Sequence, residues 1–102
     1  MPDARIAGPG DIPQGEIRGF EAEGTAVAVA NEGGTFRAFH NECTHKHCTL
    51  DDGDLEDGTV VCACHGSEFN LETGAVESPP ATEPIAVYPV RVEGDDLIVT
   101  LP

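Results

Sequence analysis

The most regular pattern of apolar and polar positions lies in the second quarter of the chain. In "TAVAVA", Val27 and Val29 alternate with alanines, as expected for a half-buried β-strand. The strand ends at "NEGG", whose glycines are typical of a tight turn, and "TFRAFH" then resumes as a second strand. The pattern predicts a β-hairpin made of these two segments.

A second hairpin is predicted near the C-terminus, in "VYPVRVEGDDLIVTL". Every second residue from Tyr88 to Val92 falls on one face, and "EGDD" supplies the turn. Leu97 and Val99 return on the second strand. Pro89 cannot donate to a β-ladder, so it places the first of these strands at a sheet edge or at a bulge.

Glycine and proline are spread along the whole chain. There are 12 Gly and 8 Pro in 102 residues, and the longest stretch without either runs from Thr35 to Asp52. Long helices are therefore disfavoured, and short strands joined by tight turns are favoured. We expect an all-β protein folded as a single domain over residues 1–102, because this length fits one core. An insertion over about residues 39–80 lies between the framing strands.

The composition is strongly acidic: 19 Asp and Glu residues oppose five Lys and Arg residues, so the net charge is −14. That charge disfavours binding to nucleic acid or to an anionic membrane, and it favours partners with basic surfaces, although simple solubility would also explain it. The N-terminal "MPDARIAGPGDIPQG" has no continuous apolar run, so neither a signal peptide nor a membrane span is expected. A cytoplasmic location is the resulting expectation.

The stretch "DDGDLEDG", residues 51–58, concentrates five carboxylates. Its glycines do not fit an EF-hand loop and no helical pattern flanks it, so calcium binding is disfavoured. We expect a solvated turn between the segments on either side.

All four cysteines and all four histidines fall in two stretches, "HNECTHKHCTL" and "VCACHGSEF". Each stretch offers one thiolate and one imidazole at short spacing: Cys43-x-His45 in the first and Cys62-x-x-His65 in the second. Zinc and iron–sulfur centres both use these two ligand types. The clustering therefore favours a metal site that draws on both stretches.

Three other interpretations stay open from the residues alone. A tetrahedral zinc site would use Cys₂His₂, although zinc motifs usually pair like ligands at short spacing. Two disulfides would use all four cysteines, but they would leave the histidines unexplained and are unexpected without an export signal. A nucleophilic cysteine with a histidine base would make the chain an enzyme, but so short a chain leaves little wall for a substrate pocket.

The remaining interpretation is a [2Fe–2S] cluster with mixed ligands, and here the sequence resembles the Rieske family. The boxes "CTHKHC" and "CACHGS" match its Cys-x-His-x-x-Cys and Cys-x-Cys-His-Gly-Ser pattern in residue type, spacing and order. The segment from Phe69 onward is also similar to the tail of Rieske-type ferredoxins, and the resemblance extends from about Gly24. It implies a Rieske-like fold, with a small antiparallel β base and a two-loop cluster-binding subdomain over about residues 39–80.

The resemblance also implies the ligands of one [2Fe–2S] cluster per chain. Cys43 and Cys62 correspond to the ligands of the inner iron, and His45 and His65 to those of the outer, exposed iron. Replacing two thiolates by neutral imidazoles removes negative charge from one iron and raises the reduction potential. His47 stands where family members often carry a small residue, and the register favours His45 as the ligand.

Other residues match accessory positions of the family. Cys48 and Cys64 match a pair that cytochrome bc-type Rieske proteins join in a disulfide and that simple dioxygenase ferredoxins lack. Ser67 matches a serine whose hydroxyl donates to a bridging sulfide in high-potential members. Those members carry a tyrosine two residues later, where this chain has Phe69, so one of two tuning hydrogen bonds is missing. Leu50 is expected to pack over the cluster, and "SPPA" matches the proline loop on its far side.

The resemblance implies a soluble one-electron carrier that performs no bond-making step of its own and is not an enzyme. Its donor would be a flavin-containing reductase and its acceptor an oxygenase, as in a multicomponent dioxygenase system. The alternative is a small Rieske subunit of a larger redox complex, such as a nitrite reductase, whose partner would be permanent.

Overall fold

The computed structural model of the chain describes residues 3–44, 48–64, 66–79 and 81–101. The strands are β1 (Asp3–Ala7), β2 (Ile17–Ala22), β3 (Thr25–Glu32), β4 (Thr35–His40), β5 (Asp54–Glu56), β6 (Thr59–Val61), β7 (Glu68–Asn70), β8 (Val76–Ser78), β9 (Val87–Tyr88), β10 (Val90–Glu93) and β11 (Asp96–Thr100). Two 3₁₀ helices of three residues each, η1 (Pro9–Asp11) and η2 (Leu50–Asp52), complete the elements of the described ranges. The all-β expectation is confirmed. No helix in these ranges is long and apolar enough to cross a membrane.

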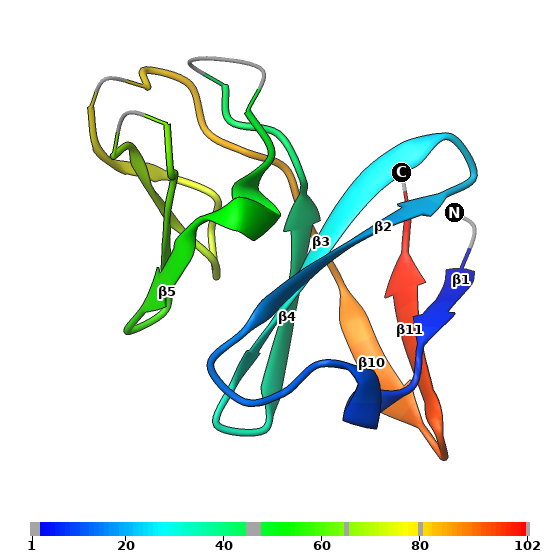
Figure 1. Ribbon diagram of the computed structural model, residues 1–102. Coiled ribbons are helices and arrows are strands. Elements are labelled where there is room, and N and C mark those ends of the chain that lie inside the picture. Colours follow the sequence, from blue (N-terminus) through cyan, green and yellow to red (C-terminus); the bar gives the residue numbers. More distant parts are fainter. Residues whose placement is uncertain (1–2, 45–47, 65, 80, 102) are drawn as a thin grey trace.

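The strands form three antiparallel sheets (Figure 1). Sheet A has the order β1-β11-β10, sheet B the order β2-β3-β4-β9, and sheet C the order β5-β6-β7-β8. Sheets A and B lie together, whereas sheet C, drawn in green and yellow, stands to one side. We call sheets A and B with their turns the base, and residues 41–84 the loop half.

The hairpin predicted in the second quarter of the chain is confirmed as β3 and β4, which are joined over six residue pairs. However, β3 is buried on both faces and not only on one. Val27 and Val29 pack into a core shared with sheet A, whereas Ala28 and Ala30 pack into a core shared with the loop half. The small alanine side chains leave room for this second layer, which the alternation alone does not reveal.

The C-terminal hairpin is confirmed for β10 and β11, in which Val92 pairs with Leu97 beside the turn. Tyr88 does not belong to this hairpin, because it lies in β9, which pairs with β4 in sheet B. Pro89 stands between β9 and β10, so the chain passes from sheet B to sheet A at the residue that cannot donate to a ladder. The strand β1, which the sequence pattern did not predict, completes sheet A by pairing with β11.

Sheet C is built from four strands of three residues each, which follow one another as a meander. The expectation of a plain solvated turn over residues 51–58 is wrong in part, because Asp54–Glu56 form β5 and pair with β6. The turn itself is Asp57–Gly58, with φ angles of 44° and 79°. A two-residue hairpin turn needs this left-handed pair, and glycine adopts it without strain.

Candidate metal centre

The loop half carries both Cys/His stretches on two loops. The first loop leaves the end of β4 and returns at η2, and the second loop joins β6 to β7. The hairpin of β5 and β6 connects them, and it pairs Asp54 with Val61, the residue before Cys62. The end of the first loop and the start of the second are therefore held side by side by backbone hydrogen bonds.

The two loops close in the same way around their first cysteine. The backbone amide of Cys43 donates to the carbonyl of Cys48 at 2.8 Å, and that of Cys62 donates to the carbonyl of Ser67, also at 2.8 Å. Each of these bonds spans five residues. In the second loop, Gly66 N also donates to the Cys62 carbonyl at 3.0 Å. The two cysteines thus occupy equivalent positions in two equivalent loops.

A disulfide joins Cys48 and Cys64, whose Cα atoms are 6.5 Å apart. It connects the end of the first loop's closure to the middle of the second loop. The pairing is the one that the resemblance to cytochrome bc-type proteins implied. It leaves Cys43 and Cys62 as the two cysteines of the chain outside a disulfide.

Cys43 and Cys62 are 3% and 2% exposed and belong to one buried cluster with Leu50 and Phe69. Leu50 is fully buried there, as expected for a residue packing over the site. Thiolates in so apolar an enclosure need a compensating cation, since burying an isolated charge is costly. A pair of buried cysteines on two cross-linked loops fits an iron–sulfur centre, in which iron would compensate the charge of the two thiolates that bind it.

Ser67 is fully buried and connects the second loop to the segment after Pro79. Its Oγ accepts a hydrogen bond from the backbone amide of Ala81 at 3.0 Å. A hydroxyl has two acceptor lone pairs and one proton, so this bond leaves the O–H proton available to donate. The predicted proline loop, of which Pro80 lies outside the described residues, is thus fixed to the ligand loop at Ala81. Nothing in the sequence pattern indicates this contact.

The remaining predicted ligands, His45 and His65, lie outside the described residues, as does His47. The structure therefore brings together the cysteine half of the predicted ligand set and does not place the histidine half. Within the described part of the chain, no group of three or more Cys, His, Asp or Glu side chains is arranged to hold a metal ion.

His40, the fourth histidine, is described and lies at the end of β4 rather than in the first loop. Its Nδ1 is 3.4 Å from the hydroxyl of Tyr88, and its Nε2 is 3.8 Å from the carboxylate of Glu42. Burial of the phenol raises the pKa of Tyr88.

A further contact that the sequence did not indicate closes the first loop from outside: Thr44 Oγ1 donates to the carbonyl of Glu83 at 2.6 Å.

Charge is divided unevenly between the two halves. The loop half has ten Asp and Glu residues against a single Lys, a net charge of −9, whereas the rest of the chain has nine acids against four arginines, a net charge of −5. Three of those arginines form ion pairs within the base: Arg5 with Asp96, Arg18 with Glu16, and Arg91 with Asp3 and Glu93. The candidate metal centre is therefore in the more acidic half.

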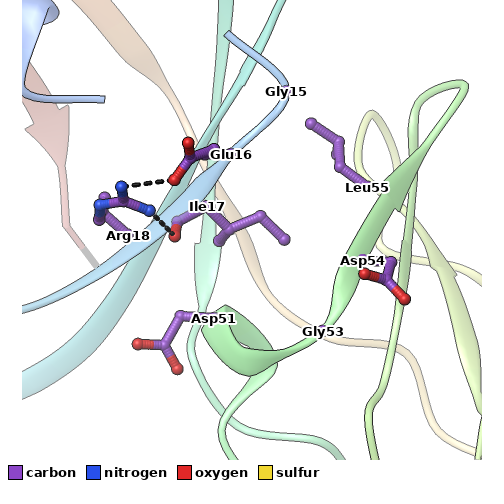
Figure 2. Close-up of a pocket in the computed structure, with 8 residues that line it drawn as sticks. All are labelled: Gly15, Glu16, Ile17, Arg18, Asp51, Gly53, Asp54 and Leu55. Atoms are coloured by element: carbon purple, nitrogen blue, oxygen red, sulfur yellow. Dashed lines mark hydrogen bonds and ion pairs between the residues drawn. The ribbon is translucent and has the colours of Figure 1, made fainter. Parts of the chain in front are cut away.

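A cavity of about 290 Å³ lies at the seam between the two halves. Figure 2 shows the segment from Gly15 to Arg18, which leads into β2, facing η2 and β5 across it. Arg18 is held beside the cavity by Glu16, at 2.5 Å, and by the carbonyl of Ile17, at 3.1 Å. The surface is therefore hollowed on this side, where the base and the loop half meet.

Comparison with known proteins agrees with the family that the Cys/His boxes resemble. Residues 4–89 match the family model described as the Rieske [2Fe-2S] domain. The chain is 40% identical, over 93 residues, to the 3-phenylpropionate/cinnamic acid dioxygenase ferredoxin subunit of Escherichia coli strain K12, which covers 90% of this chain and 87% of that protein.

Solved structures agree with this match. The ferredoxin of carbazole 1,9a-dioxygenase from Nocardioides aromaticivorans IC177 superposes with a TM-score of 0.92 at 28% identity and covers 97% of both chains. A chain from the complex of reduced oxygenase and oxidized ferredoxin in carbazole 1,9a-dioxygenase superposes with a TM-score of 0.88 at 32% identity, covering 95% of this chain and 91% of that one. The chain therefore belongs to the Rieske [2Fe-2S] domain family.

Proposed function

We propose that this chain is a one-electron carrier that holds one [2Fe–2S] cluster and passes electrons to an oxygenase. The observation that carries the proposal is the equivalence of the two loops. Cys43 and Cys62 are both buried, and the backbone amide of each donates to a carbonyl five residues later. The Cys48–Cys64 disulfide cross-links the two loops. A site with this internal symmetry suits a two-iron centre, in which each loop contributes one ligand to each metal.

In this proposal Cys43 and Cys62 bind one iron, and His45 and His65 bind the other. The bound cluster supplies a one-electron redox couple whose potential is raised by the two neutral imidazoles. The residues of the chain have three supporting tasks. They hold the two thiolates away from water, keep the loops together through the disulfide, and present the Ser67 hydroxyl for donation to a cluster sulfur.

We assign the whole of residues 1–102 to one Rieske domain, with a cluster-binding subdomain over about residues 39–80. The shared core supports this assignment, because Ala28 and Phe39 of the base pack with Cys43 and Leu50 of the loop half. We also place the protein in the cytoplasm, where a reductase and an oxygenase would be available as partners.

The named relatives support the choice of partner. One is a dioxygenase ferredoxin subunit, and another was solved in a complex of oxygenase and ferredoxin. We propose a flavin-containing reductase as the electron donor and an oxygenase as the acceptor. The charge of −9 on the loop half supports docking against basic surfaces on both, and charge complementarity of this kind accelerates transient encounters. A carrier of this type makes and breaks no substrate bonds, so the protein is not an enzyme by itself.

The cluster is tested first by composition and spectroscopy. Purified protein should be red-brown and contain about two irons and two acid-labile sulfides per chain. His45→Ala and His65→Ala should lose the cluster, while His47→Ala, the matched change within the first loop, should keep it. One zinc without sulfide would overturn the proposal, and loss of the cluster in His47→Ala alone would overturn the ligand assignment.

The carrier role is tested by kinetics with a reconstituted reductase and oxygenase. Stopped-flow reduction of the protein should slow steeply as ionic strength rises, because salt screens the attraction between exposed charges over a Debye length of about 10 Å at 0.1 M. If the protein instead co-purified with a larger redox enzyme and exchanged no electrons when separated from it, the alternative of a fixed subunit, such as that of a nitrite reductase, would replace the carrier.

A further inference from the structure

Three polar side chains are buried in the described part of the chain: Asn31, Asn41 and Ser67. Two have evident tasks. Asn31 fixes the N-terminal segment of the base, through a bond to the Ile12 carbonyl, and Ser67 fixes Ala81 to the second loop. Asn41 immediately precedes the first loop, and a buried amide at that point requires its own explanation.

Asn41 connects the base sheet to the far end of the first loop. Its backbone amide donates to the carbonyl of Ala26 at 3.0 Å, which extends the pairing of β3 and β4 by one step. Its side-chain Oδ1 accepts the backbone amide of Asp51 at 2.9 Å, ten residues later. Asp51 lies in η2, directly after the buried Leu50. One side chain therefore closes the loop that contains Cys43.

Gly19 on β2 provides the surface against which this closure sits. A Cβ atom at Gly19 would lie 2.6 Å from Nδ2 of Asn41 and 2.4 Å from a carboxylate oxygen of Asp51. Both side chains thus rest on the bare backbone of β2. The seam cavity lies alongside, and Figure 2 shows Asp51 on η2 below that strand. The Asn41–Asp51 bond therefore closes the first loop at the place where η2 meets β2 of the base.

The second loop is coupled to the same point. A Cβ atom at Gly53, two residues after Asp51, would lie 2.1 Å from the carbonyl oxygen of Val61, which precedes Cys62. The backbone at the end of the first loop is thus in direct contact with the backbone that starts the second. A shift of η2 would be transmitted to both cysteine-bearing loops.

From these contacts we propose that Asn41 is a positioning residue for the metal centre: its side chain clasps the first ligand loop closed against Gly19 of β2. The inference rests on the proposed function, because it concerns the loops that hold the cluster. Some side chains orient metal ligands without binding the metal themselves, and removing one of them usually lowers metal affinity about 10- to 100-fold.

The test compares two variants with a matched control. Asn41→Ala removes the acceptor of the Asp51 amide. Gly19→Ala leaves every hydrogen-bonding group intact but displaces both side chains, and because their flexible ends can move, the fold should survive. Asn31→Ala removes a buried asparagine of the same kind from the base, where it bonds to the carbonyl of Ile12 and the amide of Gly34.

Both clasp variants should lose the cluster to a chelator roughly tenfold faster than the unmodified protein, and the EPR g values of their reduced clusters should shift. Hydrogen exchange should rise in residues 48–53 and stay unchanged in β3. Asn31→Ala should leave the g values and the rate of cluster loss unchanged and raise exchange in the base instead. Hydrogen exchange in residues 48–53 measures how firmly the first loop is held closed, and it needs no electron-transfer partner.

The clasp would be refuted if Gly19→Ala and any folded Asn41→Ala protein matched the unmodified protein in g values and cluster loss, or if Asn31→Ala changed them equally. These outcomes differ from a failure of the proposed function, which would be an unmodified protein that contains no iron or sulfide.

Discussion

The base and the loop half are held together by different means. In the base, β3 forms six residue pairs with β2 and six with β4, and both faces of β3 are buried. In sheet C the longest ladder has three residue pairs. The base is therefore stabilised by extended strand pairing. The loop half has short ladders and a buried apolar cluster that includes Leu50, Val60 and Phe69, and it is also held by individual cross-links: the Cys48–Cys64 disulfide, Ser67 to Ala81, and Asn41 to Asp51.

This difference indicates where stability depends on the cofactor. A region with short ladders opens locally at lower free energy than one with long buried strands. The uneven charge acts in the same direction, because ten acids repel one another in the loop half, while arginines on sheet A neutralise their neighbours. The cluster and the disulfide are thus expected to determine the order of the loop half, and the base to be largely independent of them.

The largest expected effect comes from removing the metal. Chelation of iron should raise hydrogen exchange strongly throughout the loop half and leave β3 and β11 protected, because metal binding contributes directly to the folding of the loops that hold it. Hydrogen-exchange mass spectrometry of the protein with and without cluster measures this. Equal exposure of both halves would show that they fold as one cooperative unit.

The next effect is that of the disulfide. Replacing Cys48 and Cys64 together by serine should lower the free energy of unfolding by about 2–4 kcal/mol, mainly because the unfolded chain loses a constraint. Denaturant unfolding of the cluster-loaded protein measures the change. Ala63→Ser, an exposed change in the same loop, should stay within about 0.5 kcal/mol of the unmodified protein. A double variant as stable as this control would contradict the prediction.

The sequence predicted the base better than the loop half for a physical reason. β3 and β4 are long enough to show an alternation, so their hairpin was found, and "EGDD" located the turn between β10 and β11. Strands of three residues show no period, so the sequence pattern does not predict sheet C and indicates a turn at Asp54–Glu56. It does not predict β1 either, because proline and glycine follow that strand closely, although its pairing with β11 depends only on backbone groups.

For the candidate site, the sequence indicates the candidate ligands but not the residues that hold them in place. The Cys/His boxes contain the candidate ligands, so Cys43 and Cys62 could be proposed as ligands without a structure, and the family resemblance implied the Cys48–Cys64 disulfide. Their supports could not be identified in this way. The bond from Asn41 to Asp51 depends on a glycine in a strand far away in sequence, and nothing in "FHNEC" distinguishes that asparagine from one in a loop.

A smaller effect is expected for the reduction potential. Phe69 is fully buried in the cluster of side chains that contains Cys62. Phe69→Tyr should raise the potential, because a hydroxyl that donates to a cysteine sulfur stabilises the added electron. Voltammetry measures the shift, and Phe36→Tyr, in the other core, should leave the potential unchanged. An unchanged potential in folded Phe69→Tyr protein would show that the hydroxyl finds a different partner.

The smallest effect concerns a carboxylate that connects three strands of sheet C. Glu77 on β8 accepts from Thr59 Oγ1 at 2.6 Å and from Asn70 Nδ2 at 3.2 Å, and these bonds, that of Thr59 first, lower its pKa. A pKa that is lower in the folded state adds stability that is fully present above the unfolded value of about 4.5 and lost as pH falls through the folded value.

Glu77→Gln should therefore be slightly less stable than Glu72→Gln at neutral pH, since both remove one charge from the acidic half but only Glu77 receives these side-chain bonds. Because Glu77 is exposed, solvent keeps the difference small. The difference should shrink as pH falls from 4.5 through the lower folded-state pKa of Glu77, below which Glu77 is protonated in both states of the Glu72→Gln variant and its advantage over an amide disappears. Thermal unfolding of the two variants from pH 7 to pH 3 measures it. A gap that stayed constant over this range would mean that the hydrogen bonds stabilise sheet C without involving the charge of Glu77.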